Sequence, residues 1–70
     1  MKPLNEMRPH EQRVVQEKEE LDVKLKALRL FIESSPIFGN LSYREQSRLK
    51  YQADIMQRYS DVLGERIEAF

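Results

Sequence analysis

Residues 49–70 read LKYQADIMQRYSDVLGERIEAF, and the spacing of their apolar and small side chains decides the fold. These side chains recur at alternating intervals of four and three residues: Leu49, Ala53, Met56, Ser60, Leu63, Ile67 and Phe70. Such a repeat places them on one face of an α-helix, as in the a and d positions of a coiled coil. The stretch therefore predicts a long helix that packs lengthwise against another helix.

The same helix has a second apolar stripe, formed by Tyr51, Ile55, Tyr59 and Val62. A single hairpin partner covers only one face of a helix, so the second stripe favours association with further chains. Gly64 interrupts this helix at a cost of about 1 kcal/mol relative to Ala. We interpret it as allowing close approach of another helix or a ligand, the alternative being a helix that is simply weaker there.

A second long helix is expected over about residues 9–34. Pro9 suits the first helical position because its missing N–H is not needed there. The apolar residues on one face are spaced by seven, four, three and four: Val14, Leu21, Leu25, Leu28 and Ile32. Residues 4–7, before this helix, are compatible with a short turn.

Residues 35–42 are expected to form the connecting loop. Pro36 disfavours helix at the residue before it, and Gly39-Asn40 is a turn signal. Ile37, Phe38 and Leu41 are too apolar for a free linker, so the loop should fold back over one end of the helix pair. Ser42-Tyr43-Arg44-Glu45 reads as a capping box, which starts the helix of residues 43–69.

Composition is consistent with one small all-α domain over residues 1–70. The 70 residues include no cysteine, so no disulfide or thiolate metal site compensates for a small core, and oligomerisation is the expected remedy. Twelve basic residues balance twelve acidic ones, which leaves no net charge to attract nucleic acid. The apolar runs are too short for a membrane span or signal peptide, which favours a cytosolic protein.

Catalytic and metal-binding patterns are scarce. His10 is the single histidine, and neither a nucleophile elbow nor a phosphate-binding glycine loop occurs. The acidic residues of the first helix interleave with lysines, which favours a solvated charged face over a metal site: Glu17, Glu19, Glu20 and Asp22 among Lys18, Lys24 and Lys26. The sequence therefore predicts a protein that is not an enzyme and that uses no cofactor and no metal.

Basic side chains and flat rings suggest a site for a phosphorylated ligand, assembled between chains. The basic residues are Arg13, Lys24, Lys26, Arg29, Arg44, Arg48, Lys50, Arg58 and Arg66, and three tyrosines with His10 supply rings on which a base could stack. The alternative is that the tyrosines fill an interface and the basic residues pair with acids at helical spacing. For Arg13, an ion pair with Glu17 fits the spacing equally well.

Two groups of short blocks resemble a family of small phage proteins that includes the cyclic-nucleotide sponges of the anti-CBASS type. The blocks are Gln12-Arg13-Val14-Val15, Glu17-Lys18-Glu19-Glu20-Leu21-Asp22, Lys24, Leu28 and Phe31-Ile32, then Met56, Tyr59-Ser60, Val62-Leu63 and Glu65-Arg66-Ile67. The resemblance extends over residues 10–70.

The resemblance implies a short N-terminal helix followed by an antiparallel two-helix hairpin, assembled into a hexamer. It implies sequestration of cyclic di- and trinucleotides in the host bacterial cytoplasm without degradation, which would block CBASS-type signalling. The family's base-stacking and phosphate-binding positions fall on His10 and Lys24, and its trinucleotide positions on Lys26 and Arg66. Arg13, within a turn of His10, is a further candidate for a phosphate or base contact because its planar guanidinium favours bidentate pairing. His10 replaces the tyrosine of the family pattern, and Lys26 replaces a smaller polar residue.

Competing functions rank lower. A helical adaptor or structural protein could use the second apolar stripe to bind a host or phage protein. Duplex nucleic acid is a weaker candidate because the zero net charge offers little counterion release. A hydrolase is the least favoured, since no nucleophile, base or metal set is present.

Overall fold

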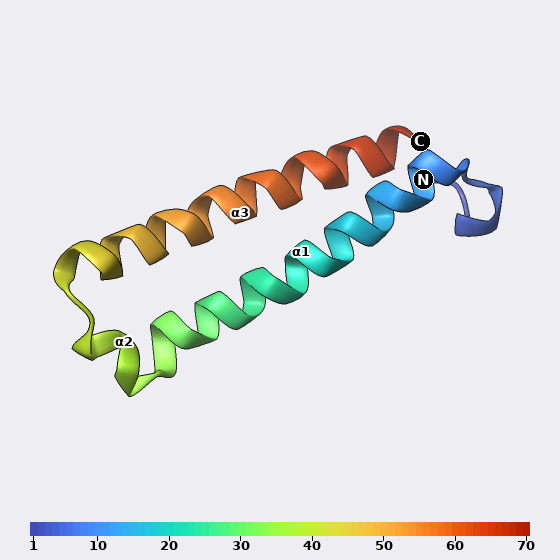
Figure 1. Cartoon of the computed structure of the whole chain (residues 1–70). Coiled ribbons are helices and arrows are strands. Elements are labelled where there is room, and N and C mark those ends of the chain that lie inside the picture. The colour runs from blue at the N-terminus through green and yellow to red at the C-terminus, as the bar shows by residue number, and fades with distance from the viewer.

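The structure, a computed structural model of residues 1–70, is all-helical and contains no strand, as the sequence predicts. A 3₁₀ helix, Leu4–Glu6, precedes α1 (Pro9–Ser34), α2 (Pro36–Asn40) and α3 (Tyr43–Ala69). Figure 1 shows α1 and α3 as an antiparallel hairpin, with α2 at its closed end and both termini at its open end. The two long helices thus bring residues far apart in sequence side by side.

The helix α2 lies within residues 35–42, where the sequence predicts only a loop, and that prediction is wrong for its five residues. Pro36 occupies the first helical position, where its fixed φ angle is favourable and no N–H is needed. The Ser35 hydroxyl caps the helix by accepting a hydrogen bond from the Ile37 N–H at 3.2 Å. Pro36 therefore starts a helix instead of ending one.

Phe38 covers the closed end of the hairpin, as expected for an apolar connection that folds back. Its ring is buried and meets Phe31 edge to face, with centroids 6.1 Å apart. The Gln46 amide on α3 donates hydrogen bonds to the carbonyls of Phe38 and Leu41, each at 3.1 Å. Ile37 does not join this packing, since 62% of it is exposed.

The capping box predicted for α3 forms only in half. The Ser42 hydroxyl accepts a hydrogen bond from the Glu45 N–H at 3.2 Å. The Glu45 carboxylate does not return to Ser42 but lies 3.4 Å from Arg48 in an ion pair one turn along the helix. A reciprocal contact of this kind occurs instead at the start of α1, where the Arg8 N–H donates to Glu11 at 2.8 Å.

The core of the molecule is the predicted seam between α1 and α3. Its tightest part lies near the open end, where Val14 packs with Leu63 and Ile67. Leu63 is 1% exposed. Leu25, Ala53 and Ser60 are also buried, whereas the other seam residues are half-buried. The four-three spacing therefore identified the buried face of both helices correctly.

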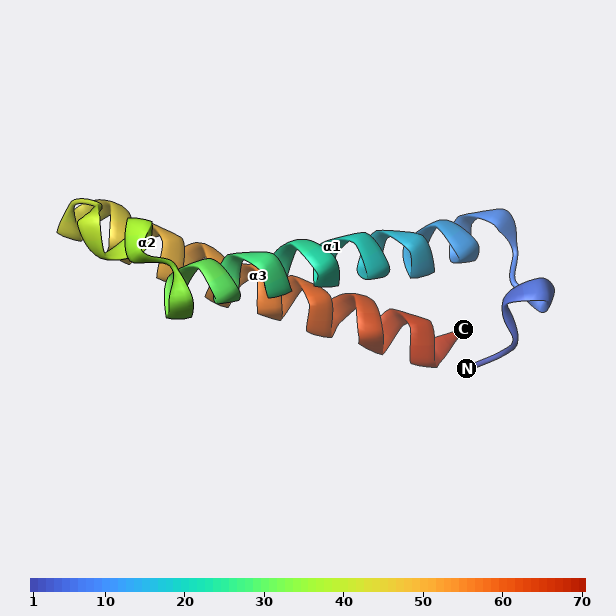
Figure 2. The ribbon, with the colours of Figure 1, turned by 90° about the horizontal axis from the view of Figure 1, so that it is seen from below.

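The hairpin is long and thin, with extents of 48 × 16 × 14 Å. Its radius of gyration is 15.4 Å, whereas a compact domain of this length has about 11 Å. Figure 2 shows the cause: the chain forms a single layer of two helices with nothing against either flank. All four residues of the second apolar stripe of α3 are consequently exposed: Tyr51, Ile55, Tyr59 and Val62.

Candidate functional site

A polar cluster joins the two long helices midway along the seam. It consists of Lys18 and Asp22 on α1 and Ser60 on α3. The Lys18 ammonium donates to Asp22 at 2.9 Å and to the Ser60 hydroxyl at 2.8 Å, and that hydroxyl donates in turn to Asp22. Ser60 is 2% exposed, yet its hydroxyl is fully hydrogen-bonded, so its burial leaves no polar atom unpaired.

This cluster stabilises the charged form of Asp22. The hydrogen bond from Ser60 is the largest cause that lowers the pKa of Asp22 below its ordinary value, and the Lys18 ammonium adds to it. The sequence pattern assigned Lys18 and Asp22 to a solvated charged face. Both side chains are partly exposed, and both also hydrogen-bond to Ser60 on α3, so this part of the charged face contributes to the contact between the helices.

The aliphatic part of Lys18 passes over α3 at Gly64. A methyl group placed on Gly64 would lie 3.4 Å from Cε of Lys18 and would meet no other side chain at closer range. Within the chain this is an ordinary van der Waals contact that does not require a glycine, so the close approach of another helix or a ligand at Gly64 stays a prediction.

Two grooves run along one face of the hairpin, one on each side of the polar cluster. Lys18 and Asp22 line both of them. The larger groove, of about 450 Å³, extends towards the closed end and has nine lining residues: Lys18, Asp22, Leu25, Lys26, Arg29, Leu30, Glu33, Gln57 and Ser60. The smaller, of about 300 Å³, extends towards the open end past Gly64 and Ile67. The larger groove falls within the size range of small-molecule sites, which begins at about 300 Å³.

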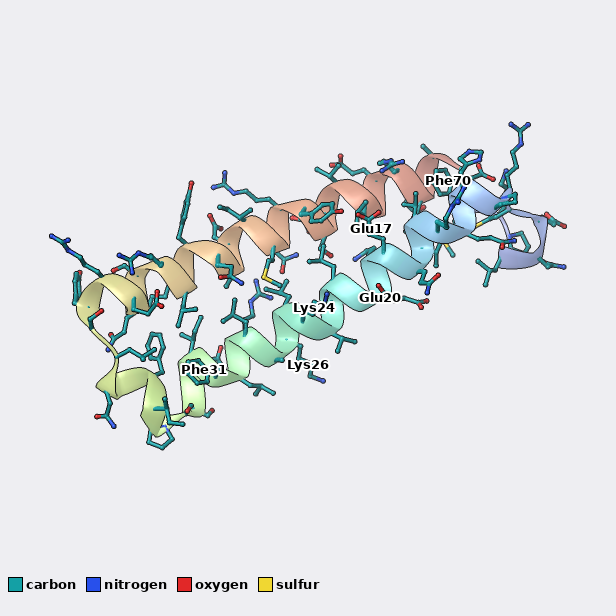
Figure 3. The ribbon with its side chains drawn as sticks, viewed as in Figure 1. Glu17, Glu20, Lys24, Lys26, Phe31 and Phe70 are labelled. Atoms are coloured by element: carbon teal, nitrogen blue, oxygen red, sulfur yellow. The ribbon has the colours of Figure 1, made fainter.

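The five candidate ligand residues of the sequence analysis are all exposed, and no intramolecular ion pair involves any of them: His10, Arg13, Lys24, Lys26 and Arg66. In particular, Arg13 does not pair with Glu17, which was the alternative interpretation of its spacing. Figure 3 shows the order along α1, with Glu17 and Glu20 nearer the open end, then Lys24 and Lys26, then Phe31 beside α2.

One chain does not bring these five residues together. His10 and Lys24 are 14 residues apart on α1, which places them about 21 Å apart along the helix axis. Arg66 belongs to the open end, because Ile67 beside it packs on Val14. Of the five, only Lys26 lines the larger groove.

The larger groove has a signal in the sequence that the five predicted ligand residues do not reflect. Lys18, Asp22, Lys26, Arg29 and Glu33 follow one another at intervals of four, four, three and four residues, which aligns them on one face of α1. Gln57 and Ser60, spaced by three, form the opposite wall on α3. This polar series is hard to distinguish in the sequence, because the apolar repeat beside it already accounts for the fold.

No set of three or more metal-ligating side chains lies together in the structure. None of the helices combines the length and the apolar character that crossing a membrane requires.

A comparison with protein families identifies the chain. The model of the family named Sequestin matches residues 8–69, which include both long helices and α2. The chain belongs to the Sequestin family. The matched region contains the polar cluster, both walls of the larger groove and all five candidate residues of this Sequestin. No curated protein and no solved structure matches the chain.

Proposed function

We propose that this Sequestin is a phage-encoded protein that binds cyclic di- and trinucleotide second messengers and holds them intact, so that CBASS-type signalling lacks its activator. The observation that carries the proposal is that His10, Arg13, Lys24, Lys26 and Arg66 are exposed and free of intramolecular ion pairs. Cationic groups without a protein carboxylate partner are available to phosphate oxygens. The name of the family is consistent with sequestration of a ligand.

The contacts with the ligand are shared between chains in this proposal. His10 stacks on a base or caps it, and Lys24 binds the phosphates of a cyclic dinucleotide. Because these two residues lie about 21 Å apart along α1, a single pocket must combine His10 of one chain with Lys24 of another. Lys26 and Arg66 would serve a trinucleotide in the same way, and Arg13, within a turn of His10, is a further phosphate or base contact.

The apolar surface supports this assembly. The stripe of Tyr51, Ile55, Tyr59 and Val62 remains uncovered in the hairpin, and further copies of the chain would bury it. We infer a homo-oligomer, with the hexamer of the resembling phage sponges as the expected size.

The protein acts by binding alone in this proposal, with no catalytic group, metal or cofactor. Its site of action is the host bacterial cytoplasm, where the second messengers are made. Duplex DNA is not an expected partner, because twelve basic and twelve acidic residues leave no net charge for counterion release.

Isothermal titration against a panel of cyclic di- and trinucleotides tests the function. We expect tight binding, and after heat denaturation chromatography should recover the nucleotide intact. Lys24→Ala should abolish dinucleotide binding without changing the oligomer, whereas Arg44→Ala, which removes an exposed charge near the closed end, should bind as the wild type does. If Lys24→Ala bound the cyclic dinucleotide as tightly as Arg44→Ala does, the role of Lys24 would be rejected.

A second candidate is a helical adaptor that binds a host or phage protein through the exposed stripe of α3. The same exposed tyrosines favour it. Light scattering separates the two functions, because a monomer that binds no nucleotide of the panel supports the adaptor, whereas a stable oligomer with bound nucleotide supports sequestration.

A further inference from the structure

We propose that the larger groove between α1 and α3 contains a phosphate subsite built by Lys26 and Arg29 within a single chain. The subsite takes one phosphodiester of a nucleotide ligand, and it rests on the proposed function for the identity of that ligand. It adds Arg29, with Gln57 and Glu33 around it, to the residues expected to contact the nucleotide.

The first support is the pair of free cations on one wall. Lys26 and Arg29 lie three residues apart on α1, so their side chains are neighbours on the helix surface. Neither forms an ion pair, whereas Lys18 in the same groove is held by Asp22. Arg29 precedes Glu33 by four residues, a spacing that permits an ion pair, yet the two are not paired. The Arg29 guanidinium therefore keeps its planar pair of donors for a phosphate.

The shape of the groove is the second support. Leu25, which is 4% exposed, lines the groove as its buried apolar residue, and Leu30 adds an exposed apolar surface beside it. Gln57 stands on the opposite wall, its amide group donating to Asp61 at 2.8 Å. The Lys18, Asp22 and Ser60 cluster closes one end. An apolar surface next to two cations suits a ligand that carries a flat base close to a phosphate.

The charges of the groove limit what binds there. Three cationic side chains line it together with the carboxylates of Asp22 and Glu33, so its net charge is +1. Such a groove matches a single phosphodiester better than a multiply charged phosphate monoester. The Glu33 carboxylate repels the phosphate electrostatically, but it can accept a hydrogen bond from an N–H of the base or from a ribose hydroxyl.

Titration of single variants with cyclic diadenylate and cyclic triadenylate tests the subsite. Lys26→Gln and Arg29→Gln should each weaken binding by about tenfold or more, as expected for loss of a charge-assisted hydrogen bond. Glu33→Gln should strengthen it, because the repulsion is removed. Arg44→Gln makes the same charge change outside the groove and should leave the affinity unchanged. Light scattering of each variant verifies that the assembly is intact.

The outcomes separate this inference from the proposed function. If the wild type binds but the Arg29 and Glu33 variants bind equally well, the subsite is rejected and sequestration stands. If the wild type binds no cyclic nucleotide, a titration of the protein with inorganic phosphate, monitored by amide NMR, tests the anion site directly. Shifts confined to the residues around Arg29 and Gln57 would support an anion site while the proposed function fails, and the absence of shifts would reject both.

Discussion

The Ser60 hydroxyl on α3 donates a hydrogen bond to the Asp22 carboxylate on α1, and it accepts one from Lys18 at 2.8 Å. These two are the only side-chain hydrogen bonds between the two long helices. Apolar packing along a four-three repeat tolerates slippage by one heptad, whereas a buried polar contact is satisfied in one register only. Ser60 therefore fixes how α1 and α3 align, and with them the two walls of the larger groove.

Replacement of Ser60 by Ala tests this contact. We expect Ser60→Ala to lower the free energy of unfolding by about 1 kcal/mol, because a buried hydroxyl between two charged partners is lost. Ser47→Ala is the matched control, since it makes the same change on an exposed turn of α3 and gains the same helix propensity. Urea unfolding measures both variants. Equal stability of the two would show that the hydrogen bonds of Ser60 contribute nothing.

Stability should also fall in acid. Hydrogen bonds from Ser60 and then Lys18 lower the pKa of Asp22, and the backbone N–H of Arg8 and then Lys2 lower that of Glu11. Because the folded pKa lies below the unfolded value, the stabilisation is complete above the ordinary values of 3.8 and 4.5. It is lost as the pH falls through the folded values.

Urea titrations at several pH values between 7 and 3 measure this effect. The free energy of unfolding should stay level down to about pH 5 and decline below it. Asp22→Asn should reduce the decline, because one of the two carboxylates with a lowered pKa is removed. A variant with the same decline as the wild type would contradict the role of Asp22.

The fold could be predicted because the apolar residues repeat at helical spacing over most of the chain. The repeat that includes Leu63 and Ile67 identified the buried face, and the breakers around Pro36 identified the position of the reversal. The helix α2 could not be predicted from those breakers. Pro36 is compatible with both a loop and a first helical turn, and the choice depends on Phe38 reaching Phe31 and Gln46.

The candidate site was harder to predict because it depends on contacts between helices. Spacing along one helix does not reveal that Lys18 crosses to Ser60, which is 42 residues away. It also does not reveal which cations stay free. Arg13 and Glu17 have the spacing of an ion pair but form none, whereas Asp54 and Arg58 have the same spacing and do. Whether such an ion pair forms depends on the rotamers of the two side chains, and these depend on the neighbouring side chains in the folded protein.

Gly64 offers a test of what covers the hairpin. A methyl group there would make an ordinary contact of 3.4 Å with Cε of Lys18, so Gly64→Ala fits the single chain. The substitution should raise the free energy of unfolding by about 0.5–1 kcal/mol through helix propensity. Thermal unfolding monitored by circular dichroism measures it. A lower stability would mean that a neighbouring chain or a ligand approaches this position in the assembly.

Phe38 should contribute most to the closed end. Its buried ring contacts Phe31, and the ammonium of Lys50 lies 5.9 Å from its centroid. Phe38→Ala should lower the free energy of unfolding by about 3 kcal/mol, at the lower end of aromatic truncations because the site is at the end of the core. Ile37→Ala, next to it but 62% exposed, is the control and should change stability by less than about 0.5 kcal/mol. Similar losses in both would show that α2 is covered on its outer side.

Self-association through the second stripe of α3 is tested by placing a charge in its centre. Ile55 is 47% exposed in the hairpin, so Ile55→Glu is tolerated by the single chain but is incompatible with burial between chains. We expect light scattering to report a smaller particle for this variant. Gln52→Glu adds the same charge outside the stripe and should leave the mass unchanged.

The same variant links assembly to ligand binding. If each pocket combines His10 of one chain with Lys24 of another, Ile55→Glu should lose nucleotide binding together with the oligomer, although Ile55 lines neither groove. A monomeric variant that still bound a cyclic dinucleotide with full affinity would place the whole site within one chain. The larger groove at Lys26 and Arg29 would then be the place that holds the ligand, because it is the part of the site that a single hairpin completes by itself.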